Sequence, residues 1–257
     1  MVKPLLVMAH GTRTTKEEWD GYDALLPEAQ VLPVDLPGHG ERLGTRCTEE
    51  AVLATFDEAV GSAQPGQPVV LLGHSLGGYL AAWYAAELTE QGRDGVLAGL
   101  VLVGTTADPA SRMAWIYKVF AQMLPRIGHE RMTLVANALY RAMGERGELP
   151  GPEAYEALGD SWRIVFEHCG PENLRAVRCP VVFVNGQYDQ MRLHVRRFAA
   201  MTPDTRQYVV RGATHLLPVT HPAALAGIVA RVLTELPDGG APASGPRTAG
   251  QRDREAG

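Results

Sequence analysis

The chain has 257 residues, of which 46% are hydrophobic and 21% are charged, and its formal net charge is −5. This composition suffices for a full hydrophobic core and excludes a wholly disordered chain. The acidic balance argues against non-specific binding to nucleic acid, and the absence of an apolar run of ~18 residues argues against a membrane span.

The N-terminal segment is typical of a first strand rather than of a signal peptide. It holds one basic residue and a short apolar run that leads directly to His10, with no small-residue cleavage site. The three cysteines, Cys47, Cys169 and Cys179, are too few and too scattered for a disulfide framework or a zinc site. Together these features predict a protein of the cytoplasm.

Short apolar runs alternate with amphipathic segments along the chain. The runs are continuously apolar and rich in Val and Leu, which is typical of strands buried on both faces of a parallel sheet. Helical spacing occurs between them, as in Val52, Phe56 and Val60. This alternation predicts a doubly wound α/β fold with a mostly parallel sheet of about six strands. The expected strands are Pro4–Ala9, Val31–Asp35, Val69–Gly73, Leu97–Gly104, Pro180–Asn185 and Gln207–Arg211.

The interval 105–178 contains helical patterns but no strand-like run. In one pattern Leu134, Ala138 and Met143 share a helix face. A helical insertion between two buried strands cannot join the sheet, and a connection of this length tends to be a functional lid. We therefore expect a helical cap at 105–178, inserted after the fourth strand, on a core formed by 1–104 and 179–236.

The C-terminal segments differ sharply in composition. A last helix is expected with Ala224, Ile228 and Val232, together with Leu233, on its buried face. Residues 237–257 contain no apolar residue larger than Ala and are rich in Gly, Pro and charge. Such a segment cannot bury enough surface to offset its ordering entropy, so we expect a disordered tail.

The sequence Gly73-His74-Ser75-Leu76-Gly77 follows an apolar strand and precedes an Ala-rich helix. A serine on so sharp a strand-to-helix turn has its hydroxyl pushed into the open at a helix N-terminus, where free N–H groups favour an anion. In this context the G-x-S-x-G pattern predicts that Ser75 is a nucleophile.

Together with two further motifs, this turn resembles the α/β-hydrolase superfamily, in its capped, esterase-like serine hydrolase branch. His10-Gly11-Thr12 resembles the oxyanion loop of that family, and Asp35-Leu-Pro-Gly-His-Gly40 resembles its D-x-x-G-H-G turn. The resemblance spans Lys3 to Leu236 and implies the α/β-hydrolase fold.

A serine hydroxyl needs a base to remove its proton and an acid to orient that base. The resemblance implies the order Ser, acid, His, with His215 as the base and Asp189 as the acid. His221 is a competing base, although its place before Pro222 suits a capping role better. Asp108 is the alternative acid, because some members take theirs from the loop after the earlier strand.

An oxyanion hole is implied by the same resemblance. It would consist of the backbone N–H groups of Leu76 and Thr12, which bind the charge that develops on a carbonyl oxygen. No nucleotide-binding glycine motif and no metal-ligand motif occurs, so neither a cofactor nor a metal is expected. The reaction class that remains after these exclusions is acyl transfer without a cofactor.

The cap supplies aromatic residues that we expect to face the substrate, namely Trp115, Phe120, Tyr140 and Trp162. An apolar pocket suits a small or medium hydrophobic ester, lactone or thioester, with neither nucleic acid nor a membrane as partner. A serine hydrolase is therefore the leading hypothesis. The same residues also serve acyltransferases, cyclases, C–C hydrolases and lyases, and a non-catalytic ligand receptor is a third possibility.

Overall fold

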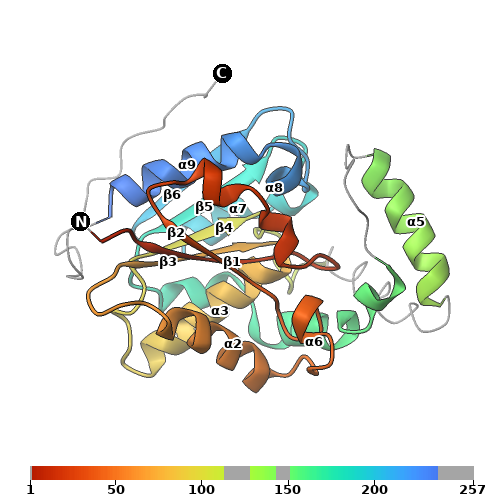
Figure 1. The fold of residues 1–257 in the computed structure, drawn as a ribbon, viewed down its shortest axis with the longest axis horizontal. Helices are drawn as coiled ribbons and strands as arrows, with labels where there is room; N and C mark the ends of the chain where they lie inside the picture. Colours follow the sequence, from red (N-terminus) through yellow and green to blue (C-terminus); the bar gives the residue numbers. More distant parts are fainter. Residues whose placement is uncertain (1, 113–127, 143–150, 237–257) are drawn as a thin grey trace.

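The computed structural model describes residues 2–112, 128–142 and 151–236. Its centre is a sheet of six parallel strands in the order β2-β1-β3-β4-β5-β6, which confirms the predicted fold class (Figure 1). The chain first runs outward to β2 and then returns past β1 to β3. Such a reversal opens a crevice at the carboxyl ends of the strands on either side of it. The strands are β1 (Leu5–Ala9), β2 (Gln30–Val34), β3 (Val69–His74), β4 (Gly99–Val103), β5 (Val181–Gly186) and β6 (Thr205–Val210).

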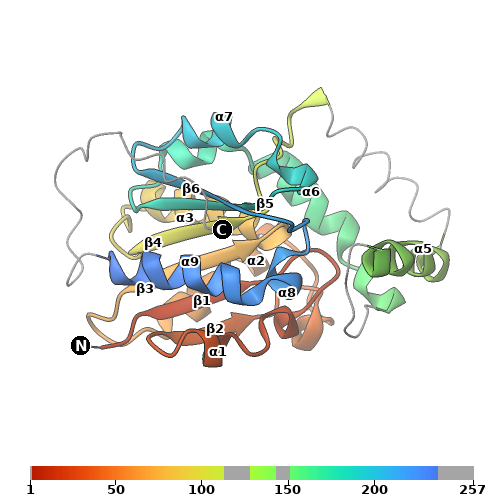
Figure 2. The same ribbon diagram turned by 90° about the horizontal axis from the view of Figure 1, so that it is seen from above.

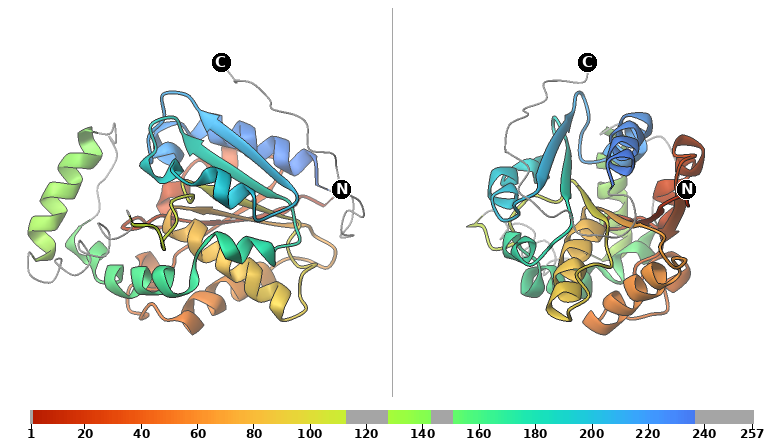
Figure 3. Two further views of the ribbon diagram at one scale, coloured as in Figure 1. Left: turned by 180° about the vertical axis from the view of Figure 1, so that it is seen from behind. Right: turned by 90° about the vertical axis from the view of Figure 1, so that its left-hand side faces the viewer.

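Both faces of the sheet are covered by helices, as the continuously apolar strands predict (Figure 3). Side chains alternate along β1, so that Leu5 and Val7 enter one core cluster and Leu6 and Met8 enter the other. The first cluster is covered by α2 (Glu49–Gly61), α3 (Leu76–Glu90), α6 (Leu158–His168) and α7 (Val195–Ala199). The second is covered by η1 (Lys16–Trp19), α1 (Tyr22–Leu25), α8 (Leu217–Thr220) and α9 (Pro222–Thr234).

The described part of the interval 105–178 is helical and divides into two parts. Helix α5 (His129–Ala142) lies beyond the carboxyl-terminal edge of the sheet (Figures 1 and 2). After η4 (Pro152–Tyr155), helix α6 and η5 (Pro171–Arg175) pack against the core of the sheet, where Ile164, Val165 and Leu174 are fully buried. The second half of the interval is therefore part of the main core.

Helix α5 does not bury the face that its sequence predicts. Leu134 is 72% exposed and Ala138 is exposed, whereas Met132 and Thr133 are buried. Met132 packs against Tyr155 and Leu158. The buried face is therefore set by the contact with η4 rather than by the apolar spacing of the helix.

Several predicted features lie outside the described residues. These are Trp115, Phe120, Met143, the side chain of Tyr140 and the expected disordered tail at 237–257. Within the described residues, no helix is long and apolar enough to cross a lipid bilayer.

Candidate active site

Ser75 lies at the turn between β3 and α3. Its backbone angles, φ 49° and ψ −114°, are strained for a residue with a side chain. The turn is possible because glycines surround it: a methyl group on Gly77 would lie only 2.6 Å from the carbonyl oxygens of Ala9 and His10. The N–H of Ser75 donates to the carbonyl of Val103 at 2.9 Å, which ties the turn to β4.

Ser75, His215 and Asp189 form a continuous chain of contacts from three different loops. His215 Nε2 lies 3.0 Å from Ser75 Oγ, and His215 Nδ1 lies 3.0 Å from Asp189 Oδ1. An ionised carboxylate only accepts hydrogen bonds, so Nδ1 carries the proton and Nε2 is left to accept one from Ser75.

Asp189 is held ionised by its surroundings. Burial alone would raise its pKa, but the hydrogen bond from His215 and the backbone N–H of Met191, at 2.7 Å, keep the pKa of Asp189 below its usual value. The carboxylate is therefore available to orient the imidazole of His215.

The two alternative residues lie elsewhere. Asp108 is buried, forms an ion pair with Arg197 and accepts a hydrogen bond from the N–H of Ala110 at 2.9 Å. His221 contacts Thr220 Oγ1 at 2.9 Å and immediately precedes α9. The contacts described for either residue do not include Ser75 or His215.

The predicted oxyanion donors flank Ser75. Leu76 is the first residue of α3, so its N–H has no partner within the helix. Thr12 follows Gly11 in the loop after β1, and Gly77 N–H donates to the carbonyl of His10 at 3.1 Å, which holds this loop against the serine turn. The Thr12 hydroxyl oxygen is buried and has no hydrogen-bond partner among the described residues.

Comparison with known proteins decides the family. The sequence profile of the alpha/beta hydrolase family matches residues 6–228. The chain belongs to the alpha/beta hydrolase family. The match confirms the family resemblance of the sequence motifs. It also supports the prediction that the protein is an enzyme.

Among curated relatives of this hydrolase-family chain, a synthase matches over most of both sequences. The 2-succinyl-6-hydroxy-2,4-cyclohexadiene-1-carboxylate synthase of Enterobacter sp. (strain 638) is 26% identical over 90% of this chain and 92% of the relative. Its counterpart from Serratia proteamaculans (strain 568) is 30% identical, but the match spans only 37% of its length. The pimeloyl-[acyl-carrier protein] methyl ester esterase of Serratia marcescens is 36% identical over 43% of this chain and 40% of the relative.

Solved structures of other proteins share the fold. The type II thioesterase BorB of the borrelidin biosynthetic cluster superposes with a TM-score of 0.69 at 23% identity, covering 90% of this chain and 93% of BorB. A thermophilic esterase from Thermogutta terrifontis gives 0.68 at 22% identity, covering 90% of each chain. Identities this low establish the fold alone.

Gly104 is a site residue of this alpha/beta hydrolase that its motifs do not reveal. It directly follows β4 with φ +59°, and a methyl group there would lie 2.9 Å from both Asp189 Oδ2 and His215 Nδ1. The backbone of Gly104 therefore packs directly against the side chains of Asp189 and His215.

We expect Gly104→Ala to lower both stability and turnover. The left-handed backbone alone costs about 1–2 kcal/mol for a residue with a side chain, and the methyl group pushes His215 from Asp189. Gly227→Ala is the matched control, since Gly227 lies within α9 with nothing described within 4 Å of the added methyl. Denaturant unfolding and kcat measure both effects, and a fully active Gly104→Ala protein would contradict the account.

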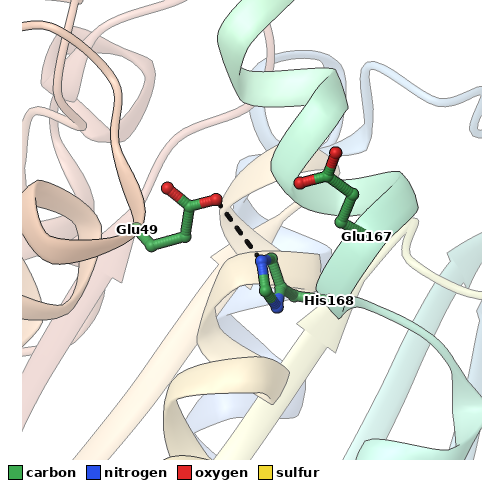
Figure 4. A group of neighbouring side chains, drawn as sticks. All are labelled: Glu49, Glu167 and His168. Carbon is green, nitrogen blue, oxygen red and sulfur yellow. Dashed lines mark ion pairs between the residues drawn. The ribbon is translucent and has the colours of Figure 1, made fainter.

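A possible metal cluster in the described residues has a simpler explanation. Glu49, Glu167 and His168 bring ligand atoms close together on the surface (Figure 4). Arg163 already pairs with both carboxylates, at 2.7 Å from Glu49 and 2.6 Å from Glu167. The cluster therefore joins α6 to the start of α2 by ion pairs.

Arg13 connects the loop after β1 to the helical interval. Its guanidinium donates to Asn137 Oδ1 of α5 at 3.0 Å and lies over the ring of Tyr155 at 4.4 Å. Trp162, expected to face the substrate, is partly buried against Phe166 and the cluster around Tyr155. These contacts hold the described part of the interval beside the loop that carries Thr12.

Proposed function

We propose that this protein is a serine hydrolase that cleaves a small or medium hydrophobic carboxylic ester, lactone or thioester through an acyl-enzyme. The observation that carries the proposal is the continuous contact of Ser75, His215 and Asp189 at the strained serine turn. Strained backbone at such a position costs free energy that folding alone does not require, and it is common at reactive sites.

In the proposed reaction, Ser75 Oγ attacks the substrate carbonyl carbon while its proton moves to His215 Nε2. The N–H groups of Leu76 and Thr12 bind the oxyanion that forms. The leaving alcohol or thiol takes the proton from His215, and an acyl group remains on Ser75. His215 then takes a proton from a water molecule while the water oxygen attacks the acyl carbon, and it returns that proton to Ser75 Oγ as the carboxylic acid leaves.

The substrate class is inferred from the residues around the site and from the relatives. Seven of the 17 aromatic residues of the chain lie in the helical interval 105–178, which suits an apolar acyl group. Relatives that share the fold include an esterase and a thioesterase. We propose a small-molecule substrate and a location in the cytoplasm, with no resident metal or cofactor.

A panel of esters, lactones and thioesters of increasing acyl length, assayed in ¹⁸O-labelled water, tests this function. One ¹⁸O atom in each released acid is the expected result, because water resolves the acyl-enzyme. Release of product without ¹⁸O, or no turnover of any carbonyl substrate by folded protein, would contradict hydrolysis.

Synthase chemistry is the second candidate, because the match to the Enterobacter synthase covers most of both chains. In that case the same serine, histidine and aspartate would catalyse a rearrangement of the substrate, or an elimination from it, rather than its hydrolysis. A product that retains all substrate oxygen, and that forms without an acyl-serine intermediate, would favour this second function.

A further inference from the structure

A buried acid and a buried histidine lie directly behind the proposed catalytic residues. Glu18 Oε2 accepts hydrogen bonds from the N–H of Gly11 at 3.0 Å and from Thr14 Oγ1 at 2.5 Å. Glu18 Oε1 lies 2.5 Å from His74 Nδ1, and His74 Nε2 lies 3.0 Å from the carbonyl oxygen of His215. The side chains of Glu18 and His74 are only 2% and 5% exposed.

The partners of His74 fix its charge. The carbonyl oxygen of His215 can only accept a hydrogen bond, so Nε2 of His74 carries a proton, and the carboxylate 2.5 Å from Nδ1 favours a proton there as well through its negative charge. Burial opposes this, but the Glu18 carboxylate outweighs it and raises the pKa of His74. Burial likewise opposes ionisation of Glu18, yet His74, Thr14 and the N–H of Gly11 lower the pKa of Glu18 to about 2. The two side chains form a buried ion pair.

We propose that the Glu18–His74 ion pair is a positioning device that joins the loop after β1, the serine turn and the loop of His215. Glu18 holds the first loop through the N–H of Gly11, the residue before the proposed oxyanion donor Thr12. His74 precedes Ser75 in the chain and holds the backbone of His215. The inference rests on the proposed function, because alignment of these loops matters only if Ser75 and His215 react.

The geometry explains why an ion pair is used here. Removing one partner leaves a buried charge without compensation, so the pair tolerates little displacement. The rings of His74 and His215 have centroids 4.9 Å apart, and a shift of His74 is therefore transmitted to His215. A displacement of about 1 Å in a reacting group can lower turnover about 100-fold.

The ion pair also predicts how stability depends on pH. Glu18 has a lowered pKa, so its contribution to the free energy of unfolding is full above pH 4.5 and is lost as pH falls toward 2. His74 has a raised pKa, so its contribution is full below pH 6.5 and is lost as pH rises through the higher value. The titratable groups that face the pair are His10, Tyr22, Asp189 and His215.

Urea unfolding between pH 2 and pH 9 measures this dependence. We expect wild-type stability to decline on both sides of the range from pH 4.5 to pH 6.5. In the double variant Glu18→Gln/His74→Gln the contribution of the pair is absent, so the decline should be shallower on both sides. Identical pH profiles for the two proteins would contradict the ion pair.

Single variants test the positioning role. Glu18→Gln keeps the shape of the side chain but removes its charge, and His74→Gln keeps a donor for the His215 carbonyl but removes the imidazolium. Glu17→Gln is the matched control, because it removes an equal charge from an exposed neighbouring residue. We expect Glu18→Gln to lower kcat by about 10- to 100-fold with little change in KM. The rate at which a fluorophosphonate labels Ser75 should fall in parallel.

The double variant Glu18→Gln/His74→Gln separates positioning from folding, since two amides can hydrogen-bond without a buried charge. We expect it to regain stability relative to the single variants while its kcat stays below that of wild type. In the wild-type protein, ¹⁵N NMR should show both ring nitrogens of His74 protonated at pH 7. A neutral His74 ring overturns the proposal even if no variant folds.

Two outcomes distinguish this inference from the proposed function. Wild-type kcat and labelling rate in Glu18→Gln and His74→Gln, with Ser75→Ala inactive, would overturn the positioning role alone. Full activity of Ser75→Ala would overturn the proposed function.

Discussion

Replacing Ser75 with alanine is expected to lower kcat by about 10⁴- to 10⁶-fold on any ester that the wild-type protein cleaves. The substitution removes the only atom that can form the proposed acyl-enzyme, while the backbone contact to Val103 and the glycines of the turn stay in place. Steady-state kinetics measures the loss, and circular dichroism checks that the fold is kept.

Ser62→Ala serves as the control for the nucleophile. Ser62 caps the end of α2, where its hydroxyl donates to the carbonyl of Ala59 at 2.6 Å, and none of its described contacts involves Ser75, Asp189 or His215. Its loss should leave kcat unchanged. If Ser75→Ala retained more than about a hundredth of wild-type turnover, a covalent mechanism through this residue would be wrong, because the missing nucleophile is worth far more.

Asp189→Asn is expected to lower kcat by about 10⁴-fold. Asparagine presents an N–H₂ group or a weaker acceptor to His215 Nδ1, which favours the tautomer whose Nε2 already carries a proton. That nitrogen cannot accept the proton of Ser75. The loss should appear in kcat rather than in KM, since Asp189 has no proposed contact with the substrate.

Asp108→Asn is the matched comparison for this acid. It breaks the ion pair with Arg197 and should reduce stability, but it leaves the contact between His215 and Asp189 intact. We expect it to retain most of its turnover at temperatures where it stays folded. If Asp108→Asn lost much more turnover than Asp189→Asn, Asp108 would be the residue that orients His215.

All six strands can be predicted from the sequence because each contains a Val- and Leu-rich or otherwise apolar run, although only β1, β3, β4 and β5 are buried along their whole length. The ends differ by up to two residues: Leu97 and Ala98 precede β4, and β6 begins at Thr205 rather than Gln207. An apolar run continues into the turn that follows a strand, whereas the ladder of hydrogen bonds stops at its last pair. The element types are therefore more predictable than their ends.

The buried face of a helix is predicted less well than its position in the chain, because contacts with a neighbouring element decide how the helix is rotated about its axis. On α9 the pattern predicts Ala224, Ile228, Val232 and Leu233. Val232 and Leu233 are buried and Ile228 is partly buried, but Ala224 is exposed, and the fully buried residues are Leu225 and Val229. On α5 the predicted face at Leu134 is exposed. Small apolar residues occur on both sides of such helices, so periodicity alone does not decide the orientation.

Ser75, Asp189 and His215 lie in contact, and their catalytic roles stay a prediction. The distances themselves cannot be predicted, because they depend on how β3, β5 and β6 are staggered in the sheet. Glu18 and Gly104 were missed for a similar reason. Glu18 is one of two successive acidic residues in an ordinary polar loop, and its burial at His74 arises only when the loops after β1 and β3 meet.

Mass spectrometry after reaction with a fluorophosphonate probe tests the central claim most directly. The account predicts a single adduct on the peptide that contains Ser75, formed in the wild-type protein, strongly slowed in His215→Gln and absent in Ser75→Ala. An adduct on another residue, or no adduct on folded protein that still cleaves an ester, would contradict it.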